Sequence, residues 1–265
     1  MAQQMQVQQA QISPEAFQLA GTYQLGTPTA DYKAALTRKS YVLMVVLLIM
    51  AVLFGFIAFQ DNSGTTDSGS MVILLIVALC AFAGFLWTAL YPIIFRSWHV
   101  YVCTEGFVFT RGSKVDACQW NQIESMWQQV TRRYVNGVYT GTDHRYTVRR
   151  NDGFEMVFND RFSKVETLGN TISQEVTRRL FPRVIEAYNA GNTVTFGPLS
   201  VSKQGVSNGK ELLSWNQIKG IGVNRGIVTV KKEGKLLNWS SVQVAKVPNI
   251  FLFMALVNSI ISGRQ

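Results

Sequence analysis

The sequence contains few of the residues that build most reactive sites. It has three cysteines and two histidines, and no Cys-x-x-Cys pair, so neither a disulfide framework nor a structural zinc site is expected. His99, Cys103 and Cys118 come nearest to a metal-ligand set, but a fourth ligand is missing. The sequence also lacks a G-x-x-x-x-G-K-[ST] phosphate loop and an H-E-x-x-H helix. We therefore expect no enzyme, no cofactor, no metal and no small-molecule substrate.

Charge is also scarce: charged residues make up 15% of the chain, and two long stretches, residues 41–59 and 71–95, contain none. Neither stretch has the polar helical face of a buried soluble helix. Each is near the length that crosses a hydrocarbon core of about 30 Å. The first stretch is longer than a signal-peptide core and no cleavage pattern follows it. The sequence therefore predicts two uncleaved transmembrane helices that form a hairpin over residues 41–96.

The charges beside these stretches predict the orientation of the hairpin. Lys33, Arg38 and Lys39 precede the first stretch and Arg96 follows the second, whereas the loop of residues 60–70 has two aspartates and no basic residue. Under the positive-inside rule, both chain termini face the cytoplasm. We expect a multi-pass protein of the cytoplasmic (plasma) membrane. Small residues on both stretches favour packing of the hairpin on itself, or on a second copy.

The remainder of the chain is basic, with 22 Lys and Arg against 12 Asp and Glu from residue 96 onward. Beside an anionic leaflet, each well-placed basic residue gains about 1 kcal/mol of attraction. The lipid bilayer is therefore an expected partner, although solubility and topology control explain the same charge. Nucleic acid is not expected, because a domain tied to a membrane helix seldom reaches it. At the other end, residues 1–40 are glutamine-rich and then basic, which predicts disorder, with a short helix beginning near Pro14.

One four-residue phrase occurs twice, as Trp120-Asn121-Gln122-Ile123 and Trp215-Asn216-Gln217-Ile218. Each copy follows a lone glycine, Gly106 or Gly205, and is surrounded by short strand-like runs. A helix-like segment follows each set of runs. The first has its apolar residues at steps of three and four from Val165 to Leu180; the second, over residues 247–261, is too short for a third crossing. The repeat predicts two tandem modules, residues 97–191 and a shorter one over residues 192–265.

This order of glycine, W-x-x-I element, antiparallel strands and closing helix resembles the bacterial pleckstrin-homology-like (PH-like) modules. The whole arrangement, over roughly residues 20–262, is similar to an uncharacterised family of bacterial membrane proteins. The resemblance implies a membrane-anchored α+β fold: a two-helix transmembrane hairpin, then two tandem PH-like β-barrel or sandwich modules, each closed by a C-terminal helix. Phosphoinositide-binding members use a long basic loop between their first two strands. We place that loop at residues 104–105 and 203–204, where it is too short for such a cradle.

Basic side chains gather in two places and form the candidate patch for anionic lipid or a partner. Strand alternation puts Arg149 and Arg150 on opposite faces, and hairpin pairing is expected to gather Arg132, Arg145 and Arg149. A second group lies on the predicted helix, where Arg179 and Arg183 are four residues apart. A solvated basic face is the favoured explanation of both groups. The candidate residues are Arg132, Arg133, Arg145, Arg149, Arg178, Arg179 and Arg183.

These features favour a non-enzymatic binding or scaffold protein that acts at the cytoplasmic membrane surface through its tandem modules. Its partner is expected to be a protein, a second copy of the chain or the bilayer itself, since open sheet edges suit peptide docking. The alternative is an oligomeric envelope-stress or transport accessory membrane protein.

Overall fold

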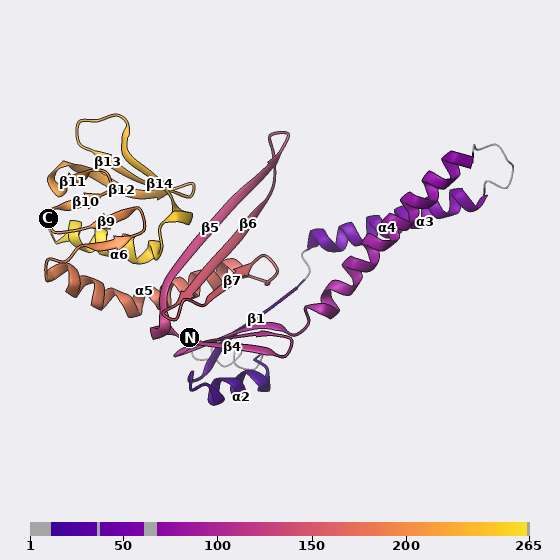
Figure 1. The fold of residues 1–265 in the computed structure, drawn as a ribbon, viewed down its shortest axis with the longest axis horizontal. Helices are drawn as coiled ribbons and strands as arrows, with labels where there is room; N and C mark the ends of the chain where they lie inside the picture. Colours follow the sequence, from indigo (N-terminus) through magenta and orange to yellow (C-terminus); the bar gives the residue numbers. More distant parts are fainter. Residues whose placement is uncertain (1–11, 36–37, 61–67, 264–265) are drawn as a thin grey trace, which may run out of the picture.

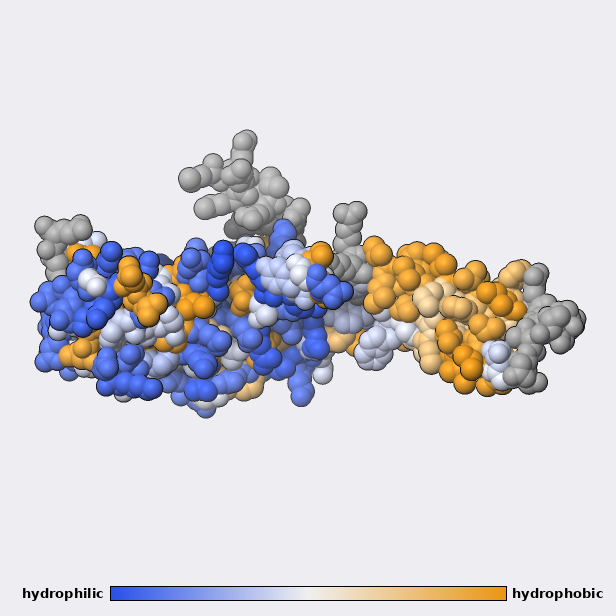
Figure 2. All heavy atoms as spheres, turned by 90° about the horizontal axis from the view of Figure 1, so that it is seen from above, coloured by the Kyte–Doolittle hydropathy of each residue, from blue (hydrophilic) through white to orange (hydrophobic). Residues whose placement is uncertain are grey.

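The computed structural model describes residues 12–35, 38–60 and 68–263. A pair of helices, α3 (Arg38–Gln60) and α4 (Ser68–Ile94), projects from a body of strands and helices (Figure 1). The surface of this helical pair is almost continuously hydrophobic, whereas the body is mostly hydrophilic (Figure 2). In the most apolar 18-residue segment of each helix, only 11% and 6% of the residues are buried. Both helices are long and apolar enough to cross a membrane, as the sequence predicted.

Small residues lie where the two helices touch. Ala58 and Ala81 are buried, and a β-carbon added to Gly84 would lie 3.3 Å from a methyl carbon of Leu47. Close approach of helix backbones at small residues favours packing between membrane helices. This contact agrees with the prediction that the pair packs on itself.

The first sheet has four strands in the order β1-β2-β3-β4. They are β1 (Pro28–Lys33), β2 (Trp98–Cys103), β3 (Gly106–Arg111) and β4 (Lys114–Gln119). β1 pairs antiparallel with β2, from Pro28 opposite Cys103 to Lys33 opposite His99. The helical pair is therefore inserted between two adjacent strands of one sheet. The prediction of a disordered segment over residues 1–40 is wrong for this stretch, because β1 completes the edge of the sheet.

Helix α2 (Pro14–Thr22) begins at Pro14, as predicted, but it is not an isolated turn in a disordered tail. Ala16 and Ala20 are fully buried in a cluster with Tyr101, Cys103 and Val108 of the first sheet. Small side chains one helical turn apart let the helix lie close to the sheet. The prediction of disorder is thus wrong for residues 12–22 as well, and residues 1–11 lie outside the described residues.

The second sheet has the order β5-β6-β7, with β5 (Ile123–Val135), β6 (Val138–Arg150) and β7 (Glu155–Asn159). The long helix α5 (Val165–Asn189) follows. Its first half buries the predicted apolar face, with Leu168, Ile172 and Val176 in the core shared by both sheets. β5 and β6 stay paired up to a two-residue turn at Asn136 and Gly137. We call β1–β7 with α5 the first β-unit.

The second β-unit repeats this order in shorter elements. A four-stranded sheet, β11-β10-β9-β8, is followed by a three-stranded sheet, β12-β13-β14, and by α6 (Ile250–Ser262). Phe253, Leu256 and Val257 of α6 are fully buried, which agrees with a closing helix. The strands are β8 (Val194–Phe196), β9 (Leu199–Val201), β10 (Gly205–Ser207), β11 (Leu212–Ser214), β12 (Ile218–Asn224), β13 (Ile227–Lys232) and β14 (Asn238–Gln243).

The repeated W-N-Q-I phrase forms the corner between the two sheets of each unit. In both copies W-N-Q is a single 3-10 turn, η1 (Trp120–Gln122) or η2 (Trp215–Gln217). The Trp120 indole donates to the carbonyl oxygen of Thr104 at 3.1 Å, and the Trp215 indole donates to that of Ser202 at 2.9 Å. Each tryptophan thus ties the corner to the turn of a preceding hairpin.

The other end of the phrase is anchored in the same way in both units. The carbonyl oxygen of Gln122 accepts from the amide of Asn151 at 2.8 Å, and that of Gln217 accepts from the amide of Glu233 at 2.7 Å. The register of the following strand shifts by one residue directly after the isoleucine in both cases. Both copies of the phrase therefore have the same backbone role, fixing how the chain turns from one sheet into the next.

The lone glycine has the same role in both units. A β-carbon on Gly106 would lie 2.2 Å from the carbonyl oxygen of Cys118, and one on Gly205 would lie 2.0 Å from that of Leu213. No other residue fits at such a distance from the neighbouring strand.

The two units share helix α5 and are joined by Asn249. The second half of α5 packs on the core of the second unit through Leu180, Phe181, Val184 and Ile185. The backbone amide of Asn249 donates to the carbonyl oxygen of Met126 at 2.7 Å. The side-chain oxygen of Asn249 accepts from the amide of Met126 at 2.9 Å. The side-chain amide of Asn249 also donates to the carbonyl oxygen of Glu124 at 3.1 Å. The units are thus held together by both apolar and polar contacts.

Candidate functional site

The arginines of the candidate patch do not form one surface. Arg132, Arg133, Arg145 and Arg149 lie on the β5–β6 hairpin, while the other three lie on α5. Pairing is continuous from Ser125 opposite Arg149 to Arg133 opposite Gly141. Because alternate residues of a strand share a face, Arg133 joins Arg145 and Arg149, and Arg132 points to the opposite face. The expected grouping of Arg132 with Arg145 and Arg149 is wrong, because the strand register puts Arg133 on their face of the hairpin and Arg132 on the other.

Acidic neighbours neutralise several of these side chains. Arg133 lies 2.8 Å from Asp143, and Arg149 lies 2.6 Å from Glu155 with its guanidinium 5.0 Å from the centre of the Trp127 ring. Such exposed pairs contribute little to stability, but they reduce the charge offered to a partner.

The arginines on α5 are paired in a similar way. Arg178 lies 2.6 Å from Glu175, and Arg179 lies 2.6 Å from Glu105 at the β2–β3 turn. Among the residues that the structure describes, Arg132, Arg145 and Arg183 have no acidic partner within 4.0 Å. These three carry the free positive charge of the set.

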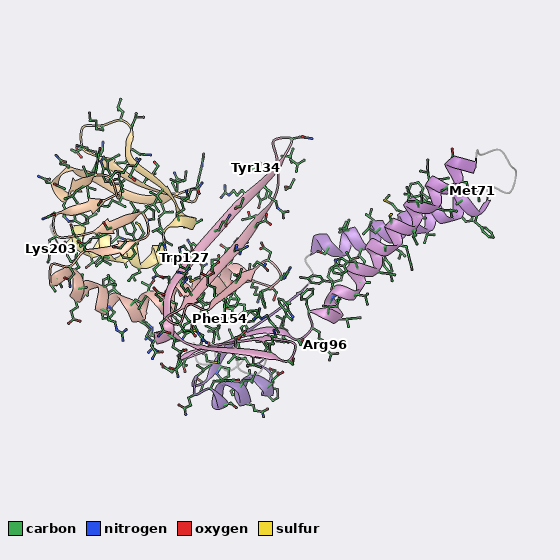
Figure 3. All side chains as sticks on the ribbon, viewed as in Figure 1. Met71, Arg96, Trp127, Tyr134, Phe154 and Lys203 are labelled. Carbon is green, nitrogen blue, oxygen red and sulfur yellow. The ribbon has the colours of Figure 1, made fainter. Side chains whose placement is uncertain are left out.

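Arg145 and Arg149 face a shallow cleft of about 220 Å³ between the two β-units. Trp127 forms part of its wall and is labelled in Figure 3 near the base of the hairpin. On the second unit the cleft is bounded by Ala245, in the 3-10 turn η3 (Val244–Lys246). A cation beside an indole ring is suited to an acidic or aromatic side chain of a docking peptide. The remaining lining residues are Gln129, Thr147 and Glu155.

The cysteines and His99 do not converge. Burial raises the pKa of Cys103 to about 11 and that of Cys118 to about 12, so both thiols are protonated at neutral pH. They belong to separate clusters, Cys103 under α2 and Cys118 in the core between the sheets. Both ring nitrogens of His99 are engaged, by Asp31 and by the carbonyl oxygen of Arg96. The described residues contain no group of three potential ligands that could hold a metal ion.

One surface was missed by reasoning from the sequence: the far end of the β5–β6 hairpin, which we call the arm. Tyr134, Val135, Val138 and Tyr139 are each more than half exposed there. The Asn-Gly pair between flanking Tyr-Val and Val-Tyr is a strong hairpin signal, so the turn was visible in the sequence. No local pattern indicates that the two strands extend far beyond the third strand of the sheet.

The fold and these surfaces define an α+β protein in which two long apolar helices are followed by several antiparallel sheets. The chain belongs to a family of unknown function, DUF6585, whose model matches residues 1–265. No curated protein and no solved structure matches the chain.

Proposed function

We propose that this protein is a non-enzymatic, membrane-anchored scaffold of the bacterial cytoplasmic membrane, and that it holds two tandem PH-like modules against the membrane surface. In this proposal α3 and α4 cross the bilayer and both termini are cytoplasmic. The modules bind a protein partner, a second copy of the chain or the bilayer.

The element order supports the PH-like assignment. Each β-unit has a four-stranded sheet, a corner at W-N-Q-I, a three-stranded sheet and one closing helix. Two bent sheets that bury their apolar faces under one helix form a complete small core. Counting strands from β1 also corrects the loop assignment. Residues 104–105 connect β2 to β3, and the connection between the first two strands is the helical pair in one unit and Gly197-Pro198 in the other. Neither offers a Lys/Arg cradle, which favours a protein partner over a specific phosphoinositide.

The insertion of the helical pair between β1 and β2 is the observation that carries the proposal. Because only residues 95–97 separate α4 from β2, which is paired with β1 and β3, the first β-unit has no long tether at its α4 end. Aromatic rings pack together between α4 and β2: the ring centres of Phe95 and Trp98 lie 4.8 Å apart, edge to face. The guanidinium of Arg161 lies 5.5 and 5.8 Å from the centres of these two rings. Such a junction suits a scaffold that presents the modules in a fixed orientation.

Topology is tested with single cysteines in intact cells, in a Cys80→Ala background. We expect Thr65→Cys to react with a membrane-impermeant maleimide from outside, and Lys235→Cys to react only after the membrane is permeabilised. Labelling of Lys235→Cys in intact cells, or release of the chain from membranes by alkaline carbonate, would refute the anchored arrangement.

Binding is tested by photocrosslinking in native membranes, with a photoreactive amino acid at Arg145 in the inter-unit cleft. Lys219, on the second β-unit and outside this cleft, is the matched exposed control. We expect one discrete adduct from Arg145 that the control position does not give. A ladder of homo-oligomers from both positions would favour the oligomeric accessory instead, and identical background from both would refute the cleft as the binding surface.

A further inference from the structure

The arm is a two-stranded ribbon over most of its length. β7 pairs with β6 only between Arg145 and Arg149, whereas β5 and β6 stay paired as far as Val135 and Val138. Two strands without a third strand or a covering helix are marginally stable in water. The arm nevertheless presents exposed apolar side chains at its end, which indicates that another surface covers them.

The tip is built as a defined shape. Asn136 and Gly137 have φ values of 49° and 79°, which suit the tight type I′ turn that matches the twist of paired strands. The rings of Tyr134 and Tyr139 lie 5.9 Å apart, edge to face. The Tyr139 hydroxyl is 2.7 Å from that of Thr142, and the Thr140 hydroxyl donates to the carbonyl oxygen of Arg133 at 3.2 Å. The exposed side chains therefore project from a fixed backbone.

The chemistry of the tip matches a bilayer headgroup region. Tyrosine rings are enriched at membrane–water interfaces, because one end is apolar and the other polar. The two valines add apolar surface without charge, being 59% and 66% exposed. Directly behind them, Arg132 supplies unpaired positive charge that anionic headgroups attract. Arg133 lies beside it in an exposed pair with Asp143, and such an exposed pair is weak enough for a lipid phosphate to replace the carboxylate.

The direction of the arm agrees with this chemistry. The arm leaves the body on the side of the helical pair and slants the same way, and in this view its tip extends past the body-proximal ends of α3 and α4 (Figure 1). In Figure 3, Tyr134 lies near the tip of the arm, and Arg96 lies at the end of the helical pair nearest the body. A bilayer crossed by the helices would therefore have its cytoplasmic surface at the tip of the arm.

We propose that the tip of the arm, residues 134–139, docks into the headgroup region of the bilayer that α3 and α4 cross, with Arg132 and Arg133 on anionic lipid phosphates. This inference rests on the proposed membrane anchoring. It adds a second point of attachment, which fixes the rotation of the body about the axis of the helical pair.

Labelling of the full chain in vesicles tests this docking. Single cysteines in a Cys80→Ala background carry a polarity-sensitive dye, and nitroxide-bearing lipids quench it at the headgroup depth. Val138→Cys reports the tip. Ile227→Cys is the matched control, because it follows the Arg225-Gly226 turn of β12–β13 as Val138 follows Asn136-Gly137. Val52→Cys reports α3. Cys103 and Cys118 remain, since both are buried.

On vesicles of phosphatidylcholine and phosphatidylglycerol, we expect quenching at positions 138 and 52 and none at 227. Quenching at 52 alone would overturn the inference and leave the anchoring intact, whereas no quenching at 52 would refute the anchoring as well. A dye at 138 that is shielded from water, not quenched by lipid and sensitive to the protein-to-lipid ratio would identify a second copy as the occupant, which also overturns the inference.

The basic part is tested by the double substitution Arg132→Gln, Arg133→Gln. Both side chains are exposed, so folding is expected to be unchanged. We expect the variant to lose most of the quenching at position 138 on anionic vesicles, whereas Arg183→Gln, an equally exposed change on α5, leaves it unchanged. Equal quenching of all three proteins would overturn the role of the two arginines.

Discussion

The two β-units differ in two additions to the same plan. In the first unit the connection between the first two strands contains α3 and α4, while in the second it is Gly197-Pro198. The first three-stranded sheet has strands of 13 residues, β5 and β6, where the second has strands of seven and six residues, β12 and β13. Both additions extend from the first unit on the same side (Figure 1).

This difference separates the part of the plan that both units share from the parts that only the first unit has. The corner built by W-N-Q-I and the lone glycine is the same in both units, because it fixes how two sheets share one core. The additions leave that corner untouched and lengthen only connections at the periphery. The second unit, which lacks both additions, is the internal control for each experiment on the first.

The strongest test of this equivalence is Gly106→Ala compared with Gly205→Ala. Each new β-carbon would lie near 2 Å from a strand carbonyl oxygen, which forces backbone movement and destabilises each unit by about 3 kcal/mol. Hydrogen–deuterium exchange should show faster exchange in β2–β4 for the first variant and in β9–β11 for the second. Gly222→Ala is the control, since its β-carbon meets nothing within 4 Å. Exchange that changes in only one of the two units would break the comparison.

Replacing each corner tryptophan by phenylalanine should lower the free energy of unfolding, by unequal amounts at the two positions. Each loses one indole hydrogen bond, worth about 1 kcal/mol, and leaves a small cavity. Trp120 is 1% exposed and Trp215 is 8% exposed, so we expect about 2–3 kcal/mol for Trp120→Phe and about 1–2 kcal/mol for Trp215→Phe. Denaturant unfolding of the full chain in detergent micelles measures both. A larger loss at Trp215 would contradict this order, which follows from the burial of the two side chains.

The independence of the two units is tested at Asn249, whose side chain bonds the backbone of β5. Asn249→Gly keeps the left-handed backbone, φ 52°, but removes both side-chain bonds, for an expected cost of about 1–2 kcal/mol. Amide exchange at Met126 and proteolysis between the units should increase. Asn136→Gly, at a second left-handed asparagine, should change neither. Unchanged protection of Met126 in the Asn249 variant would show that the units are joined without the side chain of Asn249.

The smallest expected effect is a pH dependence confined to the first unit. The Arg150 guanidinium hydrogen-bonds Asp152 in the β6–β7 turn and lowers the pKa of that carboxyl from 3.8 to about 2. Because the folded-state pKa is the lower one, the pair stabilises the turn above about pH 4 and is lost as the pH falls toward about 2. NMR titration of the Phe154 amide, which donates to Asp152, should report this midpoint. This titration of the Phe154 amide should be absent in Asp152→Asn. A midpoint near pH 3.8 in the parent protein would contradict the lowered pKa of Asp152.

The sequence predicted those parts of the fold that depend on local pattern. The uncharged length of residues 41–59 and 71–95 predicted both long helices. Apolar residues at steps of three and four predicted the buried face of α5. β1 was not predicted, because its partner β2 lies beyond the helical pair, and a strand whose neighbour is that far along the chain leaves no mark in its own residues. The strands β2 and β3 did contain a clue, since apolar residues on both faces indicate a sheet covered on both sides. That second cover is α2.

The candidate arginines were found as residues but not as a surface. Arg132 and Arg133 are neighbours in the chain, and only the strand register decides which of them faces Arg145. The free charge on Arg145 and the pairing of Arg149 with Glu155 also depend on side chains brought together by pairing across strands. The arm was invisible for a related reason: its turn is local, but its exposure depends on where β7 stops.

By itself, the sequence determined two long apolar helices, a repeated corner and two closing helices, because each follows from the periodicity or composition of one continuous segment. Only the tertiary structure decided that the helices interrupt a sheet, that α5 serves both β-units and that the arm slants in the same direction as the helical pair. Those outcomes depend on contacts between distant segments, whose free energies come from burial and pairing that no single segment encodes.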